Sequence, residues 1–280
     1  MRIIKSPAKM HEICRSFSAK GKTIGFVPTM GYLHQGHVSL LEKARKENDI
    51  VILSIYVNPT QFGPKEDLKK YPRDIGNDKK LAKRSKTDII FIPSDKDMYP
   101  QGYGTFVDVG SVTNNLCGIS RPGHFKGVAT IVTKLFNIVI PNIAYFGQKD
   151  VQQCAVIKKL VSELNMFVKI KVLPIKREND GLAISSRNVY LSEKEREDSR
   201  ILCSALYYAK KSVKHGQRSS DKIIAKAKKM ILSKRSAKID YVKIVSQDTM
   251  KDIDKVEKKA VMAIAVFIGK TRLIDNIVLG

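Results

Sequence analysis

Apolar, β-branched runs alternate with helical segments along the first half of this 280-residue chain. Residues 23–27 and 50–56 form two such runs, and the segment between them, 38–47, has its leucines and alanine at helical spacing. Strand, helix and strand in this order make the βαβ unit of a parallel sheet. The pattern predicts an α/β fold built on a Rossmann-like, doubly wound parallel sheet.

The same alternation continues to about residue 175. It predicts further helices at 75–86, 128–139 and 150–165, and further strands at 88–93, 143–146 and 167–174. Residues 98–127 are rich in Gly, Pro, Ser and Asn, and a loop of that length in a compact domain is usually functional. In such sheets ligands bind beyond the carboxyl ends of the strands, so residues 1–175 are expected to bind the substrates.

The remaining segment, 176–280, has a different pattern. Helices are expected at 192–213 and 223–232, the first beginning with a capping box of Ser192 and Glu195. Short strands are expected at 241–245, 261–268 and 273–277. This order predicts a smaller C-terminal α+β domain with antiparallel strands, which would act as a lid.

Composition is that of an ordinary soluble globular protein, with 43% hydrophobic and 28% charged residues. Lys+Arg minus Asp+Glu is 51 − 27, a formal charge of +24. Net charge bears on association and not on fold. The lysines are spread over many segments, which favours a general lysine bias. A basic nucleic-acid-binding protein stays open as the alternative.

The four cysteines lie far apart, without C-x-x-C or metal-ligand spacing. Such usage suits a reducing compartment. The first ten residues lack the apolar core of a signal peptide, and the longest apolar run, 260–268, is too short to span a bilayer. We therefore expect a cytoplasmic protein without a membrane partner. The spread of the lysines favours the absence of a nucleic-acid partner as well.

A glycine-bearing loop with two histidines follows the first apolar run. Gly31 and Gly36 would allow close approach of the backbone to a ligand, and His34 and His37 would project from one face of an opening helix turn. Helix N-termini attract anions, so a polyphosphate site is expected here. Helix-start histidines without function, or a metal pair, are the alternatives, although no third ligand follows.

Two later stretches resemble this phosphate-type loop in character. Gly147, Lys149 and Asp150 stand between a predicted strand and a helix, where an ordinary capped helix is the alternative. Residues 180–188 bring two hydroxyls and the guanidinium of Arg187 to a polar loop that would suit a pyrophosphate leaving group. A solvated interdomain linker is the alternative for that loop.

Neutral amides accompany these cations. Asn58, Gln61 and Gln153 follow predicted strands and would suit a small hydroxylated substrate. The sequence contains no evident Ser-His-Asp triad or carboxylate pair. Cations at three phosphate-type loops favour electrostatic stabilisation of nucleotidyl transfer over hydrolysis.

Long motifs in one order resemble the pantoate–β-alanine ligase (pantothenate synthetase) family nearly end to end. They are Pro28–Gly31 with His34–His37, Val57–Gly63 with Glu66–Leu68 and Tyr71–Arg73, Arg121–Thr130, Phe146–Asp150 with Gln152–Gln153, Asp180–Ala183 with Ser185–Asn188, and Gly269–Asn276. The H-x-G-H loop alone is also shared by nucleotidylyltransferases and class I aminoacyl-tRNA synthetases. The rival enzyme is thus a nucleotidylyltransferase with a phosphate-bearing acceptor, which should require cations where Gln61 and Gln153 stand.

The resemblance implies a two-step ligase reaction of pantothenate biosynthesis. ATP and pantoate give pantoyl adenylate and pyrophosphate, and the β-alanine amine then displaces AMP. It assigns catalytic roles to His34, His37, Lys149, Ser185 and Arg187, with His37 as a proton donor. The ATP-binding positions it implies are Met30, Gly31, Tyr32, Leu33, His34, Gln35, Gly36, His37, Gly147, Gln148, Lys149, Asp150, Lys176, Ile184, Ser185, Ser186 and Arg187.

The same resemblance implies the other ligands. Gln61 and Gln153 would bind pantoate, Asn58 would add a hydrogen-bonding group, and Gln61 would also lie near β-alanine. Mg²⁺ would ride on the ATP phosphates, with Asp78 in its outer shell. A homodimer through the nucleotide-binding domain is expected. The chain departs from the family pattern at four positions, which are Asn142, Gln148, Lys176 and Ile184.

Overall fold

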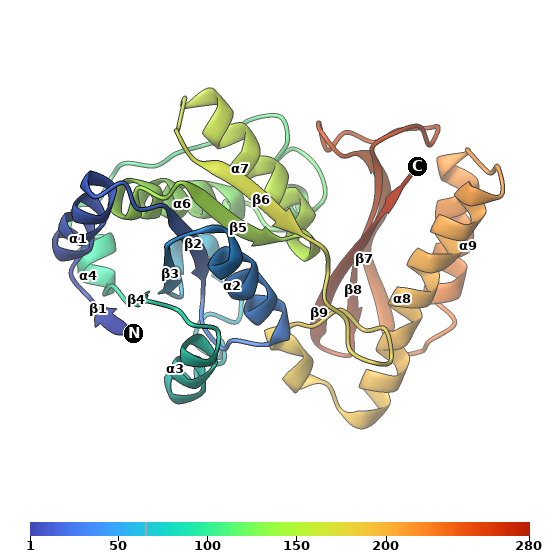
Figure 1. Ribbon diagram of the computed structural model, residues 1–280. Helices are drawn as coiled ribbons and strands as arrows, with labels where there is room; N and C mark the ends of the chain where they lie inside the picture. Colours follow the sequence, from blue (N-terminus) through green and yellow to red (C-terminus); the bar gives the residue numbers. More distant parts are fainter. Residues whose placement is uncertain (65) are drawn as a thin grey trace. The chain divides into compact units, whose positions relative to one another are not determined.

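The computed structural model describes residues 1–64 and 66–280, which divide into two compact units (Figure 1). The first unit consists of Met1–Val109, Arg121–Gly147 and Val156–Leu173, and the second of Gly110–Ser120, Gln148–Ala155 and Pro174–Gly280. The second unit therefore includes two segments that precede the expected boundary near residue 175. The division into domains 1–175 and 176–280 stays a prediction.

A six-stranded parallel sheet forms the centre of the first unit. Its strands are β1 (Arg2–Ile4), β2 (Ile24–Thr29), β3 (Ile50–Ile55), β4 (Ile89–Phe91), β5 (Ile143–Gly147) and β6 (Lys169–Leu173). They lie in the order β1-β4-β3-β2-β5-β6, with each neighbouring pair parallel. The strand order reverses between β2 and β5, which confirms the doubly wound fold. In folds of this type, ligands bind beyond the carboxyl ends of the strands at such a reversal.

Helices cover both faces of this sheet (Figure 1). They are α1 (Pro7–Ala19) and α6 (His124–Val139) on one face, and α2 (Gln35–Glu47) and α3 (Ile75–Arg84) on the other. Alternate strand residues face opposite layers. Phe26 meets Phe136 of α6 edge-on, with ring centroids 6.4 Å apart, whereas Val27 belongs to the core cluster beneath α2. This packing fixes the start of α2 against the end of β2.

The structure adds elements that the hydrophobic pattern did not predict. Strand β1 has only three residues, but α1 begins with a readable signal, since the Ser6 hydroxyl accepts from the backbone N–H of Lys9 at 3.3 Å and Pro7 follows it. Helix α6 begins at His124, four residues before the predicted start. Two short helices, η1 (Pro59–Gln61) and α4 (Asp95–Met98), complete the first unit.

A three-stranded antiparallel sheet forms the second unit, as predicted. It contains β7 (Ala237–Ser246), β8 (Ala260–Ile268) and β9 (Thr271–Leu279), with β8 in the middle. Its helices are α8 (Glu193–Lys214) and α9 (Ser220–Ile231), and the predicted capping box of Ser192 and Glu195 at the start of α8 is confirmed. Short helices are α5 (Cys117–Ser120), η2 (Gln148–Asp150) and η3 (Ser186–Tyr190), and α7 (Val151–Glu163) continues from the second unit into the first.

The two faces of this sheet carry different side chains. One face packs its apolar residues, such as Ile264 and Leu273, against α8 and α9 in a single core cluster. The other face holds polar segments of the same unit. There the Tyr241 hydroxyl lies 3.3 Å from the Cys117 thiol, and the Asn276 amide donates to the carbonyl of Gln148 at 2.9 Å.

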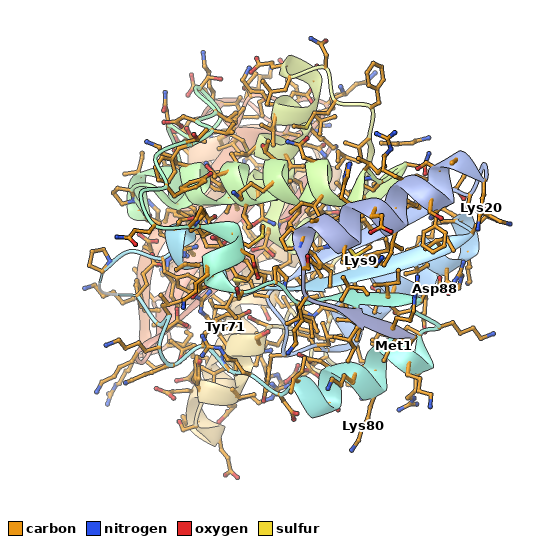
Figure 2. The ribbon with its side chains drawn as sticks, turned by 90° about the vertical axis from the view of Figure 1, so that its left-hand side faces the viewer. Met1, Lys9, Lys20, Tyr71, Lys80 and Asp88 are labelled. Atoms are coloured by element: carbon orange, nitrogen blue, oxygen red, sulfur yellow. The ribbon has the colours of Figure 1, made fainter. Side chains whose placement is uncertain are left out.

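Lysine side chains project from separate elements of the first unit. Lys9, Lys20 and Lys80 are all exposed, on or beside α1 and α3 (Figure 2). This distribution agrees with charge spread over many segments. Among the described helices, none combines the length and the apolar character that crossing a bilayer requires.

Candidate active site

The histidine pair opens helix α2 through a reciprocal cap. His34 is the N-cap residue, and its Nδ1 accepts from the Gly36 N–H at 3.2 Å, while His37 Nδ1 accepts from the His34 N–H at 3.3 Å. The two rings stack with centroids 4.0 Å apart. A Cβ on Gly36 would lie 2.9 Å from the His34 ring, so the ring could keep this position only beside glycine. Because each Nδ1 accepts a hydrogen bond, a neutral ring at either position carries its own proton on Nε2.

Asp78 holds the loop before the histidines. From α3 its carboxylate accepts the Leu33 N–H at 2.6 Å and the Tyr32 N–H at 3.0 Å. The loop is left-handed at Gly31 (φ 82°) and Tyr32 (φ 51°), and a Cβ on Gly31 would lie 2.9 Å from Ile55. Burial raises the pKa of Asp78 above its ordinary value, although the two N–H donors act in the opposite direction. Both carboxylate oxygens thus fix the turn, and the outer-shell Mg²⁺ role of Asp78 stays a prediction.

Gln61 lies in the same unit as the histidine loop and contacts it. Its Nε2 is 3.1 Å from the Met30 sulfur, and its Oε1 accepts from Asn58 Nδ2 at 3.1 Å. Asn58 is 1% exposed; its Nδ2 also donates to the Gly127 carbonyl, and its Oδ1 accepts from the Tyr99 hydroxyl at 2.7 Å. Asn58 therefore orients the Gln61 amide, while its own contact with substrate stays a prediction.

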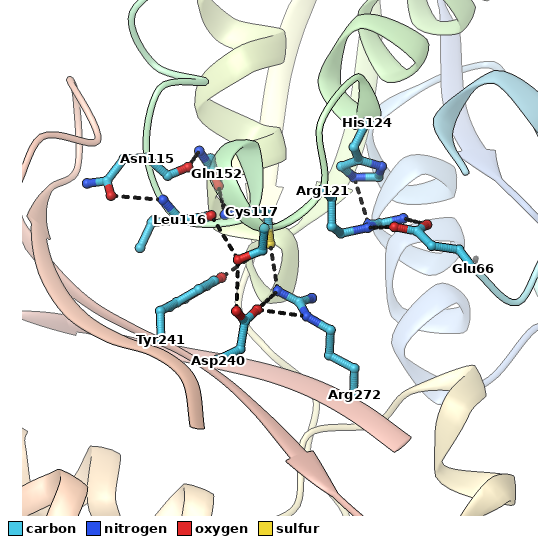
Figure 3. A network of polar contacts seen from close by, with 11 residues as sticks. Glu66, Asn115, Leu116, Cys117, Arg121, His124, Gln152, Asp240, Tyr241 and Arg272 are labelled. Atoms are coloured by element: carbon cyan, nitrogen blue, oxygen red, sulfur yellow. Dashed lines mark hydrogen bonds and ion pairs between the residues drawn. The ribbon is translucent and has the colours of Figure 1, made fainter. Parts of the chain in front are cut away.

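Arg121 and His124, which contact each other (Figure 3), both hold the backbone of Gln61. The Gln61 carbonyl lies 2.8 Å from His124 Nδ1 and accepts from the Arg121 guanidinium at 3.3 Å. Arg121 also forms a two-contact ion pair with Glu66, at 2.7 and 2.5 Å. Burial alone would raise the pKa of Glu66, but the hydrogen bond and charge of Arg121 outweigh it and hold that pKa below its usual value. The polar side chains of Arg121 and His124 thus shape the Gln61 turn.

In the second unit, η2 presents Lys149 at the point where α7 begins. The carbonyls of Gln148 and Lys149 accept from Asn276 Nδ2 at 2.9 and 3.0 Å. The preceding residue, Gly147, ends β5 in the first unit, and Met30 directly follows β2, the neighbouring strand. Both motifs therefore start from the carboxyl edge of one sheet.

The adjacent glutamines of α7 differ in surroundings. Gln152 is 4% exposed, and its Oε1 accepts from the Cys117 N–H at 2.9 Å (Figure 3). Its Nε2 donates to the carbonyls of Val112 and Asn115 at 3.0 and 2.7 Å. Gln152 therefore ties residues 110–120 to α7. The next residue, Gln153, is half-buried. Its role in binding pantoate stays a prediction.

The late loop is a tight hairpin that ends in a short helix. The Ile184 N–H donates to the Lys176 carbonyl at 3.0 Å, so these two positions meet through their backbones. The Ser185 hydroxyl caps η3 by accepting from the Arg187 N–H at 3.3 Å. Ser186 is buried. The hairpin thus fixes the backbone at the three residues expected to contact phosphates.

The predicted residues are divided between the two units. The first unit joins the Met30–His37 loop to Gln61, and the second contains Lys149 and Ser185–Arg187. Within residues 1–64 and 66–280, no three His, Cys, Asp or Glu side chains are grouped to hold a metal ion. The sequence reasoning did not assign the supporting roles of Asp78, Gln152 or Asn276. Asn276 belongs to a motif that resembles the family, which was the available signal.

Comparison with known proteins gives one consistent relationship. The family model described as pantoate-beta-alanine ligase matches residues 2–278. Pantothenate synthetase from Caldicellulosiruptor bescii is 54% identical over 278 residues, covering 99% of each chain. The pantothenate synthetase of Acetivibrio thermocellus is 52% identical with the same coverage.

Solved structures agree with the sequence relatives. A pantothenate synthetase from Thermus thermophilus has a TM-score of 0.93 at 39% identity and covers 99% of both chains. A pantoate-beta-alanine ligase from Francisella tularensis, solved with beta-gamma ATP and beta-alanine, has a TM-score of 0.83 at 37% identity over 99% of this chain and 97% of that one. The chain therefore belongs to the pantoate–β-alanine ligase family.

Proposed function

We propose that this protein condenses pantoate with β-alanine at the expense of ATP, releasing AMP and pyrophosphate. The observation that carries the proposal is that one unit contains both a phosphate-type helix start and a neutral amide in contact with its loop. The stacked pair His34 and His37 opens a helix N-terminus, which suits phosphates. The Gln61 amide contacts the same loop through Met30 and suits a small hydroxy acid.

In the first step, a pantoate carboxylate oxygen attacks the α-phosphorus of ATP. A P–O bond forms to the acid, the bond to the β-phosphate breaks, and pyrophosphate leaves. Nε2–H groups of His34 and His37 would donate to phosphate oxygens as negative charge moves onto the leaving group. Lys149, Ser185 and Arg187 would add charge and hydrogen bonds there. Such positioning and charge neutralisation account for most catalysis in phosphoryl transfer.

In the second step, the neutral amine of β-alanine attacks the acyl carbon of pantoyl adenylate. A C–N bond forms, the C–O bond to AMP breaks, and the nitrogen releases a proton to solvent. Gln61 and Gln153 would hold the pantoyl group, and Gln61 would also contact β-alanine. The buried amide of Asn58 supports this role, because it fixes which end of the Gln61 amide accepts and which donates.

The remaining assignments also belong to this proposal. Mg²⁺ would arrive on the ATP phosphates and neutralise part of their charge, with Asp78 near its outer shell. ATP would also contact the backbone at Lys176 and Ile184 and the turn Gly147–Asp150. We expect a cytoplasmic homodimer without membrane or nucleic-acid partners, in which residues 176–280 act as a lid.

Two assays test the reaction. Mass spectrometry should detect pantothenate and AMP only when ATP, pantoate and β-alanine are all present. Exchange of labelled pyrophosphate into ATP should require pantoate but not β-alanine, because the adenylate forms first. Lys149→Ala should slow this exchange by several orders of magnitude with folding retained. Exchange that proceeds equally well without pantoate would contradict the proposal and point to a different acceptor.

A further inference from the structure

Two consecutive residues of β9, Asp275 and Asn276, reach opposite faces of the three-stranded sheet. Successive side chains of a strand point to opposite sides. Both residues are buried, at 3% and 2% exposure, in a strand that is otherwise largely apolar. Buried polar side chains in proteins are nearly always hydrogen-bonded, so the partners of these two residues are informative. Neither residue has a part in the proposed reaction.

Asn276 makes three hydrogen bonds to the turn that carries Lys149. Its Nδ2 donates to the carbonyls of Gln148 and Lys149 at 2.9 and 3.0 Å, and its Oδ1 accepts from Gln148 Nε2 at 3.2 Å. The side-chain amide thus uses both donors and its acceptor on one turn. These contacts fix two successive peptide planes and so set the direction in which the Lys149 side chain leaves the backbone.

Asp275 holds the late hairpin from the other face. Its carboxylate accepts from Arg177 Nη1 and Nη2 at 2.6 and 3.0 Å, and from the Asn276 N–H at 2.8 Å. Arg177 in turn donates to the Gly181 carbonyl at 3.0 Å. This two-contact pair therefore closes the hairpin that leads to Ser185.

We propose that Asp275 and Asn276 are positioning residues for adenylylation. The two residues are consecutive in one strand, β9. They therefore hold the Lys149 turn and the hairpin before Ser185 at a fixed distance from each other. The inference rests on the proposed function, in which both segments act on the ATP phosphates. Displacement of a catalytic group by about 1 Å can cost about 100-fold in rate, so such anchors have a kinetic role.

The first test compares the two half-reactions in full-length protein. Asn276→Ala should lower kcat/KM for ATP in pantoate-dependent pyrophosphate exchange by about 10- to 100-fold. Attack of β-alanine on supplied pantoyl adenylate should change by less than about threefold, because it does not involve pyrophosphate departure. Asn276→Leu, which keeps the side-chain bulk but not the donors, should behave like Asn276→Ala.

The matched control is Ile277→Val, on the same strand but in the core cluster beneath the helices. It should leave both half-reactions near wild-type values. A second measurement is a double-mutant cycle. If Asn276 acts through Lys149, then Asn276→Ala should have little further effect on exchange in the Lys149→Ala background. Likewise, Asp275→Asn should couple to Arg187→Ala.

The outcomes separate this inference from the proposed function. Equal loss of both half-reactions in Asn276→Ala, or effects that multiply independently with Lys149→Ala, would overturn the positioning role. Unchanged exchange in Asn276→Ala and Asn276→Leu would do the same. Failure of the wild-type protein to exchange pyrophosphate in the presence of pantoate would instead refute the proposed function itself.

Discussion

Asn58 donates from its side-chain amide to the Gln61 side-chain oxygen at 3.1 Å, in a site where Asn58 itself is 1% exposed. An amide has two ends of similar shape but opposite hydrogen-bonding character. This contact occupies the Gln61 oxygen with a protein donor and directs the Gln61 NH₂ group toward the Met30 sulfur. The orientation of Gln61 is therefore set before any substrate binds.

The first prediction concerns this orientation. Asn58→Ala should raise KM for pantoate by about 5- to 30-fold, because Gln61 loses the bond that orients its amide. The KM for ATP should change much less. Steady-state kinetics with each substrate varied would measure both. Thr60→Val provides a control. It removes the hydrogen bond that the Thr60 hydroxyl donates to Asn58 Oδ1 at 3.0 Å, but it keeps the bond between Asn58 and Gln61. A pantoate KM unchanged in Asn58→Ala would refute the role.

The second prediction concerns Asp78 and the histidine loop. In Asp78→Asn the side-chain oxygen can accept a hydrogen bond from one of the two backbone N–H groups, of Tyr32 or Leu33, but the new NH₂ group faces the other. The free energy of unfolding should fall by about 1–3 kcal/mol, and pyrophosphate exchange should slow as the loop loses its geometry. Urea unfolding and exchange assays would measure the two effects.

Asp74→Asn serves as the control for Asp78. Asp74 caps the same helix by accepting from the Asn77 N–H at 2.9 Å, and it does not hold the histidine loop by any described hydrogen bond. Its replacement should leave exchange nearly unchanged. If Asp74→Asn slowed exchange as much as Asp78→Asn, the specific role of Asp78 would be wrong.

The third prediction separates capping from catalysis at His37. Gln is a common residue at this capping position, where its side-chain oxygen accepts from the N-cap backbone N–H. His37→Gln should therefore keep thermal stability closer to wild type than His37→Ala does. Both variants should lose pyrophosphate exchange by several orders of magnitude, because neither carries an imidazole. Substantial exchange in His37→Gln would show that capping is the main contribution of His37.

The fourth prediction is the pH dependence of stability at Glu47. Its carboxylate pairs with Lys171, with Lys43 at 2.9 Å, and with the Tyr145 hydroxyl at 2.8 Å. The hydrogen bond of Lys171, followed by that of Lys43, lowers the pKa of Glu47 to about 2 from about 4.5. A lowered pKa adds stability above the unfolded value, and this stability is lost as pH falls from about 4.5 toward 2.

Glu47→Gln should therefore lower the free energy of unfolding by about 1–2 kcal/mol at pH 7, allowing for partial exposure of the lysines. The difference from wild type should shrink toward pH 2. Chemical denaturation at pH 7, 4 and 2.5 would measure it. Glu12→Gln removes an exposed pair with Lys9 and should change little. A difference that stays constant with pH would contradict the assignment.

Local patterns in the sequence were sufficient for most of the secondary structure. Strand β3 and the helices α2 and α8 could be predicted because hydrophobic period and capping residues lie within a few positions of one another. Helix α1 also has such a local signal, the N-cap Ser6 followed by Pro7, but it is not part of a pattern of apolar runs. The short strand β1 had none, because three residues are too few to show a period.

By itself, the sequence determined the α/β class, the antiparallel second sheet and the resemblance to one ligase family, since these depend on local periodicity and on motifs with fixed order. The tertiary structure alone decided which polar residues support those motifs. Asp78 reaches Tyr32 across 46 residues and Asn276 reaches Gln148 across 128. Such pairings depend on strand order and register, because hydrogen bonds form between neighbours in space and no local pattern records them.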